Sequence, residues 1–118
     1  MKTIIAGSRT CNNLEYVYDA VSKCGWNITE VISGAARGAD ALGEEWAREN
    51  GIPVRRFPAE WSRYGKSAGV VRNSQMAHNA DALIALWDGK SRGTEHMIFI
   101  AKVRKLNVFV YRWEQEYV

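Results

Sequence analysis

Three segments of the chain combine glycine with a hydroxyl side chain and a basic side chain. They are Gly7-Ser8-Arg9-Thr10, Ser33-Gly34-Ala35-Ala36-Arg37-Gly38-Ala39-Asp40 and Asp88-Gly89-Lys90-Ser91-Arg92-Gly93-Thr94. Glycine lets a ligand approach the backbone closely, and exposed N–H groups and cations attract anions. These residue types therefore favour the binding of a phosphate or a similar anion. Ordinary turn formation is the alternative, because turns between strands and helices need glycine anyway.

None of the three segments is a standard nucleotide fingerprint. Gly34 and Gly38 lack the GxGxxG spacing, and no Walker-type GxxxxGKS/T motif occurs. The three segments together indicate an anion site, because they would bring four cations to one edge of the fold: Arg9, Arg37, Lys90 and Arg92. Such a group repels itself unless an anion offsets its charge.

A fourth group lies on the segment 66–79, which has helical periodicity. Gly69, Arg72, Asn73 and Met76 fall at i, i+3, i+4 and i+7, on one face of the predicted helix. No acidic residue occurs between positions 61 and 80, so we expect Arg72 to meet an anion of the ligand. A solvent-exposed polar face with a tolerated glycine is the alternative.

Three further side chains each allow two interpretations. Asp40 falls in a first helical turn, where a carboxylate is favoured, and it could equally bind a ribose hydroxyl or orient Arg37. Trp61 and Trp87 flank the predicted site, where they could stack on a base or simply pack the loops.

The residues that bind metals are sparse. The chain has two cysteines, Cys11 and Cys24, and two histidines, His78 and His96, without metal-ligand spacing and without a CxxC motif. We therefore predict no metal site and two unpaired thiols.

Strands and helices alternate along the chain. Strands are predicted at 3–6, 30–33, 53–57, 82–87 and 107–111, and each run stops at glycine, proline or polar residues. The strand at 53–57 is expected near an edge of the sheet because it begins with proline. Helices are predicted from a capping box at 12–15 to 25, from 39 to 50, from 66 to 79, and from 93 to 105, with a loop at 58–65.

This alternation predicts an α/β fold, a Rossmann-like doubly wound parallel sheet of five strands with helices on both faces. Right-handed crossovers give the strand order 3-2-1-4-5, with the switch point between the first and fourth strands. Ligands of such sheets bind at the carboxyl ends of the strands, at that switch point, and all three glycine-containing segments lie there.

Size and composition are those of one globular domain. The chain has 118 residues, of which 47% are hydrophobic and 25% charged, so residues 1–118 are expected to form a single domain. Its formal net charge of +3 is too small to predict a nucleic-acid partner. No apolar run reaches the length of a membrane span and no export signal is found, so a cytoplasmic location is expected. Self-association stays open.

Four ordered motifs resemble the YspA/YpsA-related branch of the SLOG superfamily. They are Gly7-Ser8-Arg9, the segment 33–40, Ala68-Gly69-x-x-Arg72-Asn73-x-x-Met76, and Trp87-x-Gly89-x-Ser91-x-Gly93-Thr94. The resemblance covers nearly the whole chain. It implies a Rossmann-like fold and a site for a nucleotide or a nucleotide-derived ligand.

One related branch holds phosphoribohydrolases, whose PGGxGTxxE loop carries a catalytic glutamate. In this chain Met97 stands at the glutamate position, and Glu95 lies two residues earlier, about 200° around a helix. Cleavage of an N-glycosidic bond needs a carboxylate, so this departure favours a binding protein over an enzyme.

We therefore expect a sensor or binding module for an ADP-ribose-like ligand, with no assigned cofactor. A hydrolase that cleaves an N-glycosidic or phosphoanhydride bond is the alternative, and binding of single-stranded nucleic acid is a weaker one. The predicted ligand-binding residues are Gly7, Ser8, Arg9, Ser33, Gly34, Arg37, Gly38, Asp40, Arg72, Asn73, Asp88, Gly89, Ser91, Gly93 and Thr94.

Overall fold

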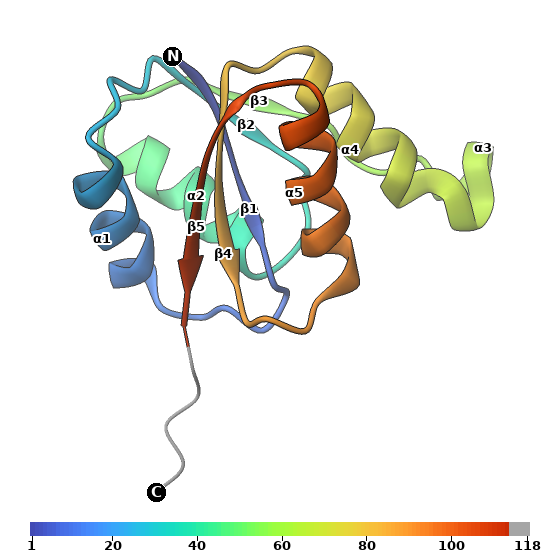
Figure 1. The fold of residues 1–118 in the computed structure, drawn as a ribbon, viewed down its shortest axis with the longest axis horizontal. Helices are drawn as coiled ribbons and strands as arrows, with labels where there is room; N and C mark the ends of the chain where they lie inside the picture. The colour runs from blue at the N-terminus through green and yellow to red at the C-terminus, as the bar shows by residue number, and fades with distance from the viewer. Residues whose placement is uncertain (114–118) are drawn as a thin grey trace, which may run out of the picture.

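A computed structural model describes residues 1–113 and contains a five-stranded sheet between two layers of helices (Figure 1). The strands are β1 (Lys2–Gly7), β2 (Glu30–Ser33), β3 (Val54–Arg56), β4 (Ala82–Trp87) and β5 (Asn107–Arg112). The helices are α1 (Leu14–Cys24), α2 (Ala39–Glu49), α3 (Trp61–Tyr64), α4 (Ala68–His78) and α5 (Arg92–Val103). All strand pairs are parallel, in the order β3-β2-β1-β4-β5. The predicted fold class and strand order are confirmed.

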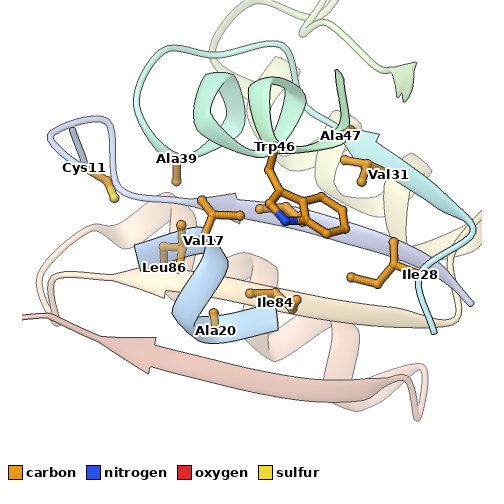
Figure 2. Close-up of a cluster of buried hydrophobic side chains, with 11 residues drawn as sticks. Cys11, Val17, Ala20, Ile28, Val31, Ala39, Trp46, Ala47, Ile84 and Leu86 are labelled. Carbon is orange, nitrogen blue, oxygen red and sulfur yellow. The ribbon is translucent and has the colours of Figure 1, made fainter. Parts of the chain in front are cut away.

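Two hydrophobic clusters, one on each face of the sheet, hold the helices in place. On one face, Trp46 of α2 and Val17 of α1 pack towards Ile84 and Leu86 of β4 (Figure 2). On the other face, Met76 of α4 joins residues of α5 and of the central strands. β1 and β4 are buried on both faces, which explains their continuous apolar sequences.

Helix α1 shows how local sequence sets the boundaries of an element. The Asn13 side chain accepts a hydrogen bond from the Glu15 N–H at 3.0 Å, which caps the helix. Gly25 ends it in the left-handed conformation, with φ of 67°, and its N–H donates to the Val21 carbonyl. The predicted stop at Gly25 is confirmed, and the helix begins within the predicted segment 12–15, but Asn13 caps it alone rather than in a capping box.

The predicted loop at 58–65 is wrong in part. Residues Trp61–Tyr64 form the short helix α3, and a 3₁₀ turn at Gly65–Ser67 connects it to α4, which begins at Ala68 rather than at Lys66. The Tyr64 N–H donates to the Glu60 carbonyl at 3.0 Å, which closes one helical turn. No glycine or proline lies between these two residues to interrupt that turn. α3 projects beyond the sheet (Figure 1).

Candidate functional site

The carboxyl ends of β1, β2 and β4 border two adjoining cavities, of about 580 and 360 Å³. The cavities are continuous in their lining, because Arg9, Ala36, Trp61 and Arg72 belong to both. They lie at the switch point of the sheet, where the chain leaves β1 for the α1–α2 face and β4 for the α4–α5 face. The structure therefore places a cleft at the predicted edge.

Most of the predicted residues line this cleft. The larger cavity is lined by Gly7, Ser8, Arg9, Asp40, Arg72, Asn73, Asp88, Ser91, Gly93 and Thr94, and the smaller one adds Gly34 and Arg37. Gly69 and Met76 also line the larger cavity, so the predicted face of α4 turns towards the cleft. A Cβ on Gly69 would meet no atom within 4 Å, which shows that this helix position borders open space.

Ser33, Gly38, Gly89 and Lys90 were expected at the site but do not line either cavity. The Ser33 hydroxyl is fully buried and donates to Glu44 Oε2 at 2.6 Å. Gly38 has φ of 81°, and its hypothetical Cβ would lie 2.5 Å from the Arg9 Cα, so it permits two loops to cross.

Gly89 and Lys90 belong to the turn that follows β4. Gly89 has φ of 82°, and the Arg112 guanidinium packs against it. Lys90 is exposed, and its N–H donates to the Asp88 carboxylate at 2.8 Å. These two residues shape the turn rather than the cavity wall.

The smaller cavity is strongly cationic. Arg9, Arg37 and Arg72 line it beside Gly34, Ala35 and Ala36, and no acidic side chain is among its described lining residues. Arg9 and Arg37 are exposed, whereas Arg72 is partly buried. Three guanidinium groups around one cavity offer planar donors that match the oxygens of a phosphate.

Arg72 is held by protein groups as well as facing the cleft. Its Nη1 donates to the Gly34 carbonyl at 2.6 Å, and its Nε donates to Asn73 Oδ1 at 3.1 Å. Burial lowers the pKa of the Arg72 guanidinium, Asp40 opposes that effect, and Arg9 adds to it. The sequence has no acidic residue near Arg72, but the fold brings Asp40 of α2 close enough for its charge to act on the guanidinium.

Gly34 separates Arg72 from Asp40. A Cβ at this position would lie 2.7 Å from Arg72 Nη1 and 2.7 Å from Asp40 Oδ2. Glycine thus lets both groups approach from either side, whereas a larger residue would displace the Arg72 guanidinium or the Asp40 carboxylate.

Asp40 is a buried carboxyl group at the floor of the larger cavity. It is 5% exposed, and its Oδ2 accepts a hydrogen bond from the Ala36 N–H at 3.2 Å. Burial raises its pKa to about 6, although the Ala36 N–H and the Arg72 charge act in the opposite direction. Asp40 therefore holds the loop after β2, a role that sequence reasoning did not assign to it.

Asn73 connects Arg72 to a histidine that the sequence did not single out. Its Nδ2 lies 3.3 Å from the Gly93 carbonyl and 3.1 Å from His96 Nδ1. His96 lines the larger cavity, on the first turns of α5. Its spacing of three residues from Gly93 was the available signal, because it places both residues on one side of the helix.

The loop after β4 is closed by its own side chains. Asp88 Oδ1 accepts hydrogen bonds from the Lys90 and Ser91 N–H groups, at 2.8 and 2.9 Å. Burial acts to raise the pKa of Asp88, but these N–H groups and the Ser8 hydroxyl outweigh it and lower the pKa. Ser91 caps α5 by accepting from the Thr94 N–H at 3.4 Å.

Arg92 and Trp61, which the sequence analysis placed at or beside the site, also line the larger cavity. Its further lining residues outside the predicted ligand set include Thr10, Lys66, Val70, His96 and Met97. Met97 is 2% exposed, while Glu95 is exposed and does not line either cavity. No carboxylate therefore stands in the cavity wall at the position where the related phosphoribohydrolase loop carries its glutamate.

Two further properties concern residues 1–113, the part that the structure describes. In this range no three His, Cys, Asp or Glu side chains lie close enough together to hold a metal ion. No helix in the same range is long and apolar enough to cross a membrane.

Two known proteins are similar to this chain. A solved structure of DNA processing protein A from Streptococcus pneumoniae aligns over 92% of this chain, with a TM-score of 0.74 and 19% identity. This chain spans about half of that one (49%), and the likeness shows a shared fold. The curated Gene 61 protein of Mycobacterium phage D29 is 35% identical over an alignment of 105 residues, which covers 80% of this chain and 83% of that protein.

The family comparison agrees with the motifs read from the sequence. A model of the YspA, cpYpsA-related SLOG family matches residues 1–64, which include β1, β2 and the loops that follow them. Because this match covers more than half of the chain, the chain belongs to the YspA, cpYpsA-related SLOG family.

Proposed function

We propose that the cleft binds a nucleotide or a nucleotide-derived phosphorylated ligand, such as an ADP-ribose-like molecule, and that the protein is a binding or sensing module. One observation carries this proposal: Arg9, Arg37 and Arg72 surround the smaller cavity, and none of its described lining residues is acidic. Three cations at one site repel each other, and a phosphate group would remove that cost. The family assignment is consistent with such a ligand.

The larger cavity suits the nucleoside part of the ligand. Its volume of about 580 Å³ lies within the usual range for small-molecule sites. Met76 and Met97 supply an apolar wall, and Trp61 offers a ring that is 55% exposed where the two cavities join. Aromatic rings stack on bases of any sequence, so this residue would hold a base without selecting it strongly.

The test is ligand-induced thermal stabilisation with three probes: ADP-ribose, AMP and inorganic phosphate, each at about 1 mM. ADP-ribose is expected to raise the melting temperature, and Arg9→Ala and Arg37→Ala should each remove most of that rise. Both residues are exposed, so these variants should fold normally. Arg48→Ala, an exposed arginine near the end of α2, is the matched control. If none of the probes changes the melting temperature, the proposal is wrong.

The burial of Asp40 favours a second candidate function, hydrolysis of the bound ligand. A buried carboxyl group with a pKa raised to about 6 can hold a proton near neutral pH, as a general acid must. Incubation with ADP-ribose, followed by chromatography, tests this function. Product formed by the parent protein and lost in Asp40→Asn would support it, whereas binding without product would exclude it for this probe.

A further inference from the structure

The orientation of the Asn73 side-chain amide is fixed by two neighbours of opposite character. Arg72 Nε, at 3.1 Å, can only donate, so the atom that faces it is the amide oxygen. The Gly93 carbonyl, at 3.3 Å from the other end of the amide, can only accept, so the atom that faces it is the nitrogen. Both neighbours require the same orientation of the amide.

This orientation determines the tautomer of His96. The Asn73 amide nitrogen lies 3.1 Å from His96 Nδ1 and carries only donor hydrogens. Nδ1 must therefore accept, which places the proton of the neutral ring on Nε2. Since the ring lines the larger cavity and Nδ1 is occupied, Nε2–H is the group of His96 left for a ligand.

We infer that His96 is a specificity residue of the cleft, which donates a hydrogen bond from Nε2 to an acceptor atom on the nucleoside part of the ligand. The identity of the ligand rests on the proposed function above, whereas the tautomer rests on Asn73 alone. In this tautomer Nε2 has no free lone pair, so His96 positions the ligand and does not remove a proton from it.

The same hydrogen bonds connect the two ends of the cleft. Arg72 lines both cavities and donates to Asn73, which in turn donates to His96 in the larger one. Arg72, Asn73 and His96 would thus bind both an anion in the smaller cavity and a hydrogen-bond acceptor in the larger one. A neutral imidazole N–H donates a single hydrogen bond in one direction, whereas a lysine ammonium can donate three. His96 therefore binds only a ligand whose acceptor atom lies in that direction.

The first experiment is nitrogen NMR of the histidine rings at pH 8, where exposed imidazoles are neutral. The chain has only two histidines, and the exposed His78 has its own donor at Nδ1, Arg104 Nη1 at 3.3 Å, so its signals should stay the same in the parent and in the Asn73 variant. We expect His96 to show the Nε2–H tautomer alone. Asn73→Asp, which turns the donor at Nδ1 into an acceptor, should move the proton to Nδ1. A parent spectrum with the Nδ1–H tautomer, or with a mixture of tautomers at His96, would overturn the assignment.

The second experiment measures the affinity for ADP-ribose by calorimetry. His96→Ala should weaken binding by about 2- to 12-fold, the range for one neutral hydrogen bond. His96→Gln, which keeps an N–H donor, should recover part of the loss, and both variants should melt within a few degrees of the parent. Unchanged binding by His96→Ala would refute the ligand contact. If the parent protein itself does not bind ADP-ribose, the proposed function and this contact both fail for that probe, while the spectrum still decides the tautomer.

Discussion

The loop after β2 and the loop after β4 are similar in composition, and in both a carboxylate and a hydroxyl accept hydrogen bonds from N–H groups of the loop itself, but the two loops differ in the cations around them. In the second, Asp88 and Ser91 accept hydrogen bonds from the N–H groups of their own loop, so the loop is closed by local contacts. In the first, the Asp40 carboxylate holds the Ala36 N–H, and the loop lies beside three arginines. Ala35 there has φ of 60°, a conformation that costs a non-glycine residue about 1 kcal/mol or more.

This difference teaches that a glycine, a hydroxyl group and a cation do not by themselves define an anion site. The β4 loop has all three, but its Lys90 lines neither cavity and its Arg92 lines only the larger one. The β2 loop keeps its cation exposed and gains two more from other elements, Arg9 and Arg72. The following changes test the contrast, from the largest expected effect to the smallest.

Asp40→Asn should give the largest effect, and the effect should depend on pH. Burial raises the folded-state pKa of Asp40 to about 6, above the unfolded value near 4, so the folded protein binds this proton more tightly. The contribution of protonated Asp40 to the free energy of unfolding is fully present below pH 4, and it is lost as the pH rises through 6. The variant should therefore match the parent near pH 4 and exceed it by roughly 2–3 kcal/mol at pH 7. Denaturant unfolding at both pH values measures this, and a difference that is constant with pH would contradict it.

Gly34→Ala should disrupt the β2 loop. The new Cβ would stand 2.7 Å from both Arg72 Nη1 and Asp40 Oδ2, so Arg72 must leave the Gly34 carbonyl. We expect a loss of about 1–3 kcal/mol in unfolding free energy, the cost of an unpaired buried group, and at least tenfold weaker binding of ADP-ribose. Denaturant unfolding and calorimetry measure the two effects. Parent-like values in both would mean that Arg72 is not held as described.

Asp88→Ala should destabilise the β4 loop without removing the anion site. The Lys90 and Ser91 N–H groups would lose their acceptor, at a cost of about 0.5–2 kcal/mol, as for the loss of a helix cap. Asp88→Asn keeps an acceptor oxygen and is the matched control, with a smaller loss. Stabilisation by ADP-ribose should persist in both variants. If Asp88→Ala abolished it, the β4 loop would belong to the anion site after all.

Gly93→Ala should have the smallest effect, and of the opposite sign to Gly34→Ala. Gly93 lies in the first turn of α5, and a Cβ there would meet no atom within 4 Å. Alanine favours a helix over glycine by up to about 1 kcal/mol, so the variant should be slightly more stable. A melting temperature below that of the parent would show that this glycine is needed for a contact that the structure does not contain.

Local signals allowed the fold to be predicted from the sequence. Continuous apolar runs and the glycines after them determine the strands, and the alternation with helices leaves few topologies. The short helix α3 was missed because four residues are too few for a periodic pattern. The glycines and arginines of the loops at the site could be placed because they follow strands β1, β2 and β4, and the carboxyl ends of parallel strands meet at one edge of the sheet.

The missing parts of the site are contacts across the chain. Asp40 and Arg72 are far apart in the sequence, and nothing in either segment indicates that Gly34 lies between them. His96 was set aside as an isolated histidine, because its partner Asn73 belongs to another helix. Ser33 was expected at the ligand, but it turns to Glu44 on α2. Side-chain direction of this kind depends on packing, which residue spacing does not encode.

The pairing at the centre of the sheet has a consequence for how the protein is synthesised. β1 pairs with β4, from Thr3 opposite Ala82 to Gly7 opposite Leu86, across most of the chain. Contacts this distant in sequence form late, because a long loop must close first, and they make folding slow. A nascent chain that stops before β4 exposes one edge of β1 and lacks the loop with Ser91, Gly93 and Thr94. The cleft therefore cannot exist on the ribosome until the fourth strand has emerged, and the residues 1–64 that match the family contain only half of its walls.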